Sequence, residues 1–520
     1  MSTQKGQQKE KLEMLIHDRV YDVSEFVRKH PGGSVIRYYL GQDATDAFEG
    51  FHQRSEKAHK WLKAIPSRPV RADDNFTTDT RSRELITNFQ KFRQGLIDDG
   101  YFKPDYLHVV YRLIELVLMF ALSFWLLRQN FFLLGIFVGG IASGRCGWVQ
   151  HEGGHHSLTG KVWLDQLIQK VTISFGLVTS GPKWNAMHTK HHATPQKEDF
   201  DVDVDTLPFV AFYKEALERG RRIHMTPNWW LRYQHYTFLP VTSVFNVFFW
   251  HFYLHPREYL FKRPDPLTAV VVASRYIVHY ACTLAVHGWF LSTWTLFASL
   301  FIAGIYLFGN FSLNHTHLPT TKADEERTWA EYGIDYTMNV DCNWFVNWWM
   351  GYLNCQIEHH LFPTMPQYKQ PQIVERTRQF CQENGMKYQS MPYIKALGAM
   401  LGNLRNIAHQ VDDVLPPLPE RQRAYREAKK ARSLAAMADK ETASEDSDAS
   451  SVPVTTSRAA GKGGKLTASK RNPSVANLST SESGDGDDDV RSDAAFVPPA
   501  SAGGRKAAHK RGQRATVAAK

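Results

Sequence analysis

The chain has 520 residues and a formal net charge of +10, so it is too long for one ordinary domain. Residues 421–520 alone carry 19 basic and 12 acidic side chains, or +7, so the basic balance does not indicate a nucleic-acid partner for the rest of the chain. The five cysteines lack CxxC spacing, which argues against a disulfide framework or a zinc ribbon and fits a chain facing the reducing cytosol.

Residues 1–11 are polar and predict no signal peptide. The first motif is His30-Pro-Gly-Gly33, and Phe51-His52 follows it. These residues resemble the haem-binding fold of cytochrome b5. The resemblance implies an α+β domain in which His30 and His52 hold haem b at both axial positions, a closed site suited to electron transfer. We expect this domain over residues 1–67, shortened at its start, and a helical connector over residues 68–105.

Four apolar segments approach the ~20 residues needed to cross the hydrocarbon core of a membrane. Short polar connections pair them, so the sequence predicts four transmembrane helices in two hairpins: residues 106–127 with 131–149, and 267–287 with 293–313. Five polar side chains in or near these segments are expected at helix ends or facing protein: Arg112, Glu115, Arg145, Arg275 and His279.

Two hairpins return the chain to the side that it left, so both termini and residues 150–263 are expected on one side. Arg257, Lys262 and Arg263 indicate that this side is cytosolic. Residues 238–254 are also apolar, but Pro240 and the odd count of segments predict an interfacial helix rather than a fifth span.

Three histidine clusters lie close to the apolar segments. They are His151-Glu-Gly-Gly-His155-His156, His188-Thr-Lys-His191-His192 and Gln356-Ile-Glu-His359-His360. Imidazole is a common metal ligand, and spacings of three and four residues place two rings on one helix face. The clusters therefore predict a polyhistidine metal site at a membrane surface.

The haem-type module, the two hairpins and the three clusters together resemble the front-end fatty acyl desaturases over residues 15–410. They are most similar to the microalgal Δ6 group. The phrases Cys146-Gly-Trp-Val-Gln-His-Glu-Gly-Gly-His155 and His191-His-Ala-Thr-Pro-Gln196 carry this resemblance. Gln356 is the most specific position, because acyl desaturases without a fused cytochrome b5 usually have histidine there.

The resemblance implies a mainly α-helical integral membrane desaturase domain at residues 106–415, with a cytosolic diiron cap. Two non-haem irons would use O2, with electrons passing from NADH through a cytochrome b5 reductase and the fused haem. The implied iron ligands, which are also the catalytic residues, are His151, His155, His188, His191, His192, His359 and His360, and we include His156 in the metal set. Residues 310–317 imply one more ligand, His315 ahead of His317, with Asn314 a water-mediated contact.

Several neighbours have two interpretations. The acidic run either orients iron-bound imidazoles or forms a solvated loop: Asp199, Asp201, Asp203 and Asp205. Two glutamates inside the clusters are partners of the ligands or are exposed: Glu152 and Glu358. Other neighbours line an acyl tunnel or anchor the chain at the interface: Trp184, Asn185, Trp344, Trp348 and Trp349.

Residues 416–520 are rich in Ser, Ala, Gly, Lys and Asp and predict a disordered tail. The predicted activity is insertion of a cis double bond between an existing one and the carboxyl end, with Δ6 on C18 polyunsaturated acyl chains (linoleoyl or α-linolenoyl) preferred. Δ5, Δ4 and Δ8 positions, a sphingolipid long-chain-base desaturase and a non-catalytic haem electron carrier are the alternatives. The acyl chain is expected on CoA or phospholipid, in a multi-pass protein of the endoplasmic reticulum membrane.

Overall fold

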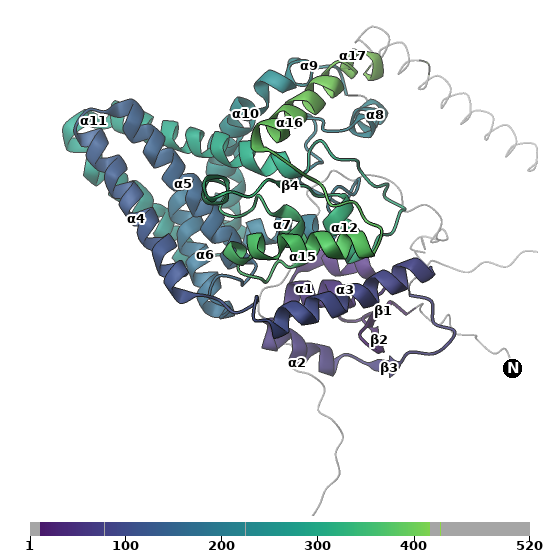
Figure 1. Ribbon diagram of the computed structural model, residues 1–520. Coiled ribbons are helices and arrows are strands. Elements are labelled where there is room, and N and C mark those ends of the chain that lie inside the picture. Colours follow the sequence, from purple (N-terminus) through teal and green to yellow (C-terminus); the bar gives the residue numbers. More distant parts are fainter. Residues whose placement is uncertain (1–10, 77–78, 224, 416–426, 428–520) are drawn as a thin grey trace, which may run out of the picture.

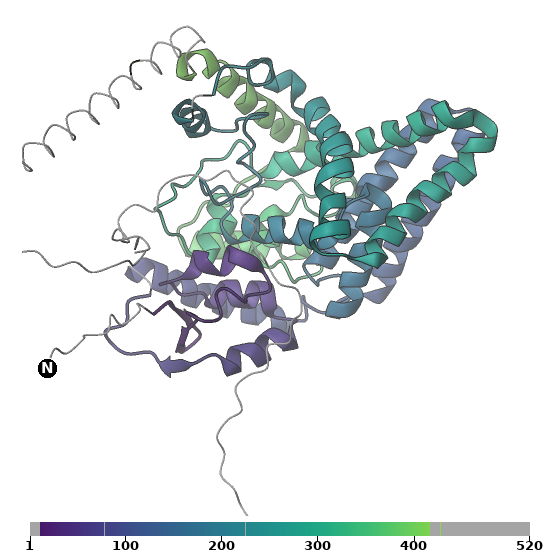
Figure 2. The same ribbon diagram turned by 180° about the vertical axis from the view of Figure 1, so that it is seen from behind.

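A computed structural model describes residues 11–76, 79–223, 225–415 and 427 (Figure 1). A small N-terminal module lies against one end of a larger helical body, as both views show (Figures 1 and 2). The predicted tail at residues 416–520 lies outside the described residues except for Glu427.

The N-terminal module contains a three-stranded antiparallel sheet in the order β1-β2-β3. Met14, Ile16 and Val23 alternate inward and form its core with Ala44. Three short helical segments complete the module. Its elements are β1 (Glu13–Ile16), β2 (Arg19–Asp22), the 3₁₀ helix η1 (Gly33–Tyr39), α1 (Thr45–His52), α2 (Glu56–Ala64) and β3 (Ser67–Pro69).

The connector forms one helix, α3 (Thr80–Asp98), which begins at the Asp79 cap and packs on the helical body. Phe89 is fully buried and stacks on Phe362 at 5.5 Å between ring centroids. Aromatic packing therefore fixes the connector against the segment that follows the third histidine cluster.

Three helices of the described residues are long and apolar enough to cross a membrane: α4 (Tyr106–Arg128), α5 (Phe132–Gly154) and α11 (Pro266–Phe311). Helix α11 is broken at Gly288, whose φ of 69° favours glycine. His279 Nε2 lies 2.8 Å from the Ser292 carbonyl oxygen, although thirteen residues of straight helix would separate these positions by about 20 Å. The chain thus folds back at Gly288, and its two arms match the third and fourth predicted segments.

The charged residues of these helices face protein, as the sequence predicted. Arg145 donates to Glu115 at 2.5 Å and Arg112 lies 3.5 Å from Glu152, all four being buried or nearly so. Arg275 is 2% exposed and lies over the Phe120 ring. The two ion pairs offset part of the cost of burying their charges, whereas Arg275 has aromatic rings as neighbours instead of a carboxylate.

Of the remaining elements, α6 (Val162–Leu177) packs along α5 and α11, α10 (Gln234–Phe245) packs on α11, and most of the others form a cap at the end of the long helices. Helix α10 continues into the π-helical segments η2 and η3, which expose Phe248, Phe252 and Phe261 along one side. This segment is not among the described helices that could span a membrane, and its exposed aromatic side fits the predicted interfacial helix. The elements are α6 (Val162–Leu177), α7 (Gly181–Ala193), α8 (Lys214–Arg222), α9 (Trp229–Arg232), α10 (Gln234–Phe245), η2 (Asn246–Leu254), η3 (Arg257–Lys262), η4 (Ser312–Asn314), α12 (Trp329–Asp335), β4 (Asn339–Val340), α13 (Trp344–Trp349), α14 (Gln356–Leu361), η5 (Gln367–Lys369), α15 (Gln370–Glu383), β5 (Ser390–Met391), α16 (Tyr393–Ala408) and α17 (Val411–Val414).

The N-terminal module docks on the helical body through both apolar and polar contacts. Phe51 packs edge-on against Trp329 at 5.3 Å, and Tyr39 donates to the carbonyl oxygen of Ala193 at 3.1 Å. Arg54 donates to the carbonyl oxygens of Thr364 and Phe102. The module is therefore held in one orientation.

Replacing Arg54 with alanine is expected to loosen this docking by about 1.5–3 kcal/mol, the worth of hydrogen bonds made by a charged group. Faster hydrogen exchange in α1 would report the change, with the haem absorption spectrum unaltered. Arg28 is exposed on the same module, and Arg28→Ala is the matched control. Equal exchange rates in the two variants would contradict the role of Arg54.

Candidate metal centre and adjoining cavities

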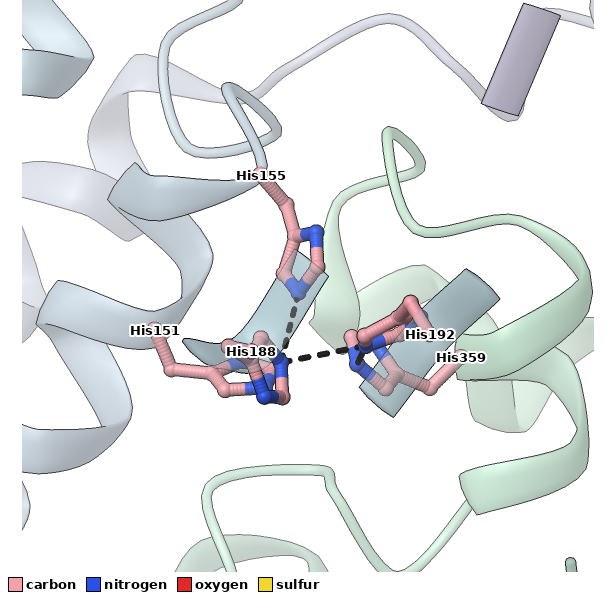
Figure 3. A group of neighbouring side chains, drawn as sticks. All are labelled: His151, His155, His188, His192 and His359. Carbon is pink, nitrogen blue, oxygen red and sulfur yellow. Dashed lines mark hydrogen bonds between the residues drawn. The ribbon is translucent and has the colours of Figure 1, made fainter. Parts of the chain in front are cut away.

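The three histidine clusters meet at the cap end of the long helices. His151 lies in the last turn of α5 and His155 is its C-cap residue, while the second cluster lies on α7 and the third on α14. One group comprises five residues whose ligand atoms all lie within 4.8 Å of one another (Figure 3): His151, His155, His188, His192 and His359.

Ring nitrogens in this first group lie at metal-binding separations. The Nε2 atom of His188 is 3.0 Å from those of His155 and His192, and His359 Nε2 is 3.0 Å from His192 Nε2. Such separations suit neighbouring ligands around one ion with metal–nitrogen bonds of about 2.0–2.1 Å.

A second group contains His191, His315 and His360, which come from α7, the turn after α11 and α14. The Nδ1 atom of His315 lies 3.1 Å from the Tyr336 carbonyl oxygen, and its Nε2 lies 3.0 Å from the amide nitrogen of Gln356. The structure therefore brings His315 to the centre, whereas His317 and His156 lie outside both groups.

Most rings of the two groups are suited to bind a metal ion in their neutral form, with His191 as the exception. Burial, followed by neighbouring histidines, holds the pKa values of His188, His192, His359 and His360 well below the ordinary value. Burial lowers the pKa of His155 and His315 to about 3. Both ring nitrogens of His360 are buried without a hydrogen-bond partner, as expected of a side chain that binds an ion.

One carboxylate of the acidic run contacts the centre directly. Asp201 lies 3.0 Å from His191 Nδ1 and is fully buried, and Asp203 follows at 3.6 Å. Burial disfavours protonated His191, but the charges of Asp201 and Asp203 outweigh it and raise its pKa to about 9. Asp199 and Asp205 instead pair with Arg219, so the two interpretations of this run apply to different residues.

Asp201→Asn is expected to lower iron retention and product formation by roughly 10- to 100-fold, since a carboxylate fixes the tautomer and orientation of a ligating imidazole. Iron remaining after dialysis against a chelator would measure the effect. Asp199→Asn changes the same charge outside the metal groups and should retain iron like the unmodified protein. Similar iron loss in both variants would show that only the net charge of the run matters.

Some other polar neighbours contact the histidines directly, and others pair with the residues around them. Glu152 pairs with Arg112 and accepts from the Gln367 backbone, and Glu358 accepts from Asn339 and Tyr388. Gln367, which the sequence reasoning missed, places its side-chain amide 2.6 Å from His151 Nδ1. Gln367 lies in the turn after the third cluster. This closeness in sequence was the only signal that could have predicted its contact with the metal centre.

The N-terminal module contains a cavity of about 540 Å³ with His30 and His52 in its lining. Their ring centroids lie 6.1 Å apart. Burial lowers the pKa of His30 and, with the charge of His30, lowers that of His52 to about 3, so both rings are neutral donors. Apolar side chains make up most of the rest of the module's lining, including Val35, Phe48 and Leu62. The residues present fit a haem held by two histidines.

A second cavity, of about 440 Å³, extends from the histidine groups into an apolar region. His151, His188 and His315 line its metal end, and its other lining side chains include Phe238, Phe245 and Trp250. Trp184 lines this cavity and stacks on His188 at 4.3 Å. Trp344, Trp348 and Trp349 are not in the lining, and Trp344 is 82% exposed.

Two buried histidine groups, an apolar cavity that begins at them and a bis-histidine haem cavity define a membrane oxidoreductase that modifies lipid chains. The family model for fatty acid desaturases matches residues 100–392, and the model for cytochrome b5-like haem or steroid binding domains matches residues 2–70. The chain therefore belongs to the fatty acid desaturase family, in the form with a fused cytochrome b5 domain that binds haem. This family uses two irons at its histidine clusters, with O2 as co-substrate.

The relatives support front-end desaturation of acyl lipids. The chain is 42% identical to an acyl-lipid (8-3)-desaturase of Rebecca salina, over 78% of this chain and 93% of the relative. It is 37% identical to an acyl-lipid (8-3)-desaturase of Thraustochytrium, over 76% and 92%. Identity to a Delta(6)-fatty-acid desaturase of Caenorhabditis elegans is 27%, over 75% and 95%. The preference for Δ6 is thus not specifically supported.

Proposed function

We propose that each histidine group holds one iron and that together they form the catalytic centre of the desaturase. The observation that carries this proposal is the convergence of eight imidazoles, six buried and two half-buried, at the inner end of an apolar cavity. Irons bound there would supply the oxygen chemistry that removes hydrogen from an unactivated CH₂. The cavity residues would hold the acyl chain against the centre and exclude water. His156 and His317 are left out of this ligand set because they lie outside both groups.

The same proposal covers topology and electron supply. The two arms of α11, with α4 and α5, would make four spans, placing the histidine groups and both termini on the cytosolic face of the endoplasmic reticulum. A separate NADH-cytochrome b5 reductase would reduce the haem. Fusion keeps that haem at high effective concentration beside the irons. We retain the domain bounds 1–67, 68–105, 106–415 and 416–520.

For the position of the new bond, we propose the (8-3) specificity of the two relatives above 35% identity. We take this designation to mean an acyl chain with a double bond at carbon 8 and a new bond three carbons nearer the carboxyl end. Δ6 desaturation of C18 chains, whose first double bond lies at carbon 9, is the second candidate, favoured by the Caenorhabditis elegans relative. Phospholipid is the preferred acyl carrier, since the names of both (8-3) relatives specify acyl lipid.

Yeast expressing the full chain would be fed separately with C20 acids unsaturated from carbon 8 and C18 acids unsaturated from carbon 9. Mass spectrometry of derivatised products locates the new bond. Product from the C20 feed alone supports (8-3) specificity, and product from the C18 feed alone supports Δ6. New sphingoid-base unsaturation without acyl product would favour the long-chain-base alternative. If the purified protein contained haem but no non-haem iron, the alternative of a non-catalytic haem electron carrier would be favoured.

A further inference from the structure

The haem cavity is not enclosed by the N-terminal module alone. Its lining continues onto the desaturase part of the chain, which contributes the end of the first histidine cluster and residues of α6 and α7. These residues are Gly154, His155, His156, Val162, Gln166, Trp184, Asn185, His188 and Thr189.

Trp184 has a special place in this wall. Among the residues that the structure describes, Trp184 and His188 alone line both the haem cavity and the apolar cavity. The indole stacks on His188, with an angle of 26° between the two ring planes. A Cβ atom on Gly154 would lie 2.7 Å from the indole, so the absence of a side chain there lets Trp184 pack on the end of α5. The indole is therefore fixed between the two cavities.

His156 provides a polar contact in the same wall. Its Nε2 atom is buried and has no hydrogen-bond partner, and its backbone adopts a φ of 56°, which is uncommon outside glycine. A buried donor without a partner is costly, which indicates a ligand group at this point. Haem carries two carboxylates that could accept such a bond.

We propose that the desaturase part forms one wall of the haem site, with Trp184 as its apolar contact and His156 as a hydrogen-bond donor to a haem carboxylate. The haem-binding unit is then the assembled protein. Haem retention would depend on residues far outside the cytochrome b5-like segment. This inference concerns cofactor binding and is independent of which fatty acid is the substrate.

The test measures transfer of haem from the full-length, haem-loaded protein to excess apomyoglobin, followed in the Soret band. Trp184→Ala is expected to release haem at least tenfold faster, and His156→Leu at least threefold faster. Trp184→Phe keeps an aromatic wall and should remain within threefold of the unmodified protein. Trp344→Ala removes an exposed tryptophan outside the lining and should leave the rate unchanged.

A raised rate in either Trp184→Ala or His156→Leu, with Trp344→Ala unchanged, supports the shared wall. Unmodified rates in both variants would overturn it and place the haem site within the N-terminal module alone. If Trp184→Ala does not fold, His156→Leu and Trp184→Gln provide the same comparison. The readout needs neither substrate nor turnover, so a failed desaturation assay does not affect it.

Discussion

Replacing His360 with alanine is expected to abolish product while the haem spectrum stays intact. His360 is one of three histidines in the second metal group, and both of its ring nitrogens are buried without a hydrogen-bond partner. Loss of a residue that only orients a metal ligand costs up to about 100-fold in activity. Loss of the ligand itself should therefore reduce activity by more than about 100-fold. Product analysis and iron content per haem would measure both consequences, with iron falling from about two to about one per chain.

His317→Ala is the control for that experiment, because His317 lies close in sequence to His315 but outside both groups. It should retain two irons per haem and most of the activity. Near-normal turnover in His360→Ala would show that the third cluster does not hold a catalytic iron. Loss of iron in His317→Ala would return this residue to the ligand set.

Replacing His30 with alanine is expected to remove haem and product together. His30 and His52 face one another across the haem cavity, so the variant leaves a single axial donor in a pocket shaped for two. The low-spin haem spectrum should disappear, while non-haem iron remains at about two per chain. Absorption spectroscopy and iron analysis on the same sample separate these effects.

His59→Ala provides the comparison for His30→Ala. His59 packs on Phe48 at 5.2 Å but is not in the cavity lining, so its loss should leave the haem spectrum unchanged. A low-spin spectrum that persists in His30→Ala would contradict the axial assignment. Product formed without haem would show that electrons reach the irons by another route.

The sequence pointed to the three clusters by their local spacing and to the haem pair by its resemblance to cytochrome b5. It did not divide the clusters between two groups. His191 and His192 are consecutive on α7 yet belong to different groups, and His359 and His360 on α14 divide in the same way. Consecutive residues point about 100° apart around a helix, so this division follows from helix geometry once the helices are placed.

Other features depend on tertiary contacts that no local pattern contains. The sequence ranked His315 ahead of His317 but kept both, and only the turn after α11, where the Tyr336 carbonyl oxygen orients the His315 ring, separates them. The sequence predicted a short turn between the two apolar segments. In the structure this turn is a sharp break at Gly288 inside α11. Asp201 could not be separated from Asp199 because both belong to one acidic run, and they differ only in their tertiary partners, His191 for Asp201 and Arg219 for Asp199.

If the first histidine group holds an iron, as proposed, it would also determine when this protein can mature. His359 contacts His192 across 167 positions of sequence, and the group cannot close until α14 has been synthesised and docked. Metal binding to such a site contributes directly to folding stability, because the unfolded chain offers no preformed site. Contacts of this range also slow folding. Iron supply during biosynthesis should therefore govern the amount of folded enzyme, and iron-starved cells should degrade the chain rather than accumulate an intact apoprotein.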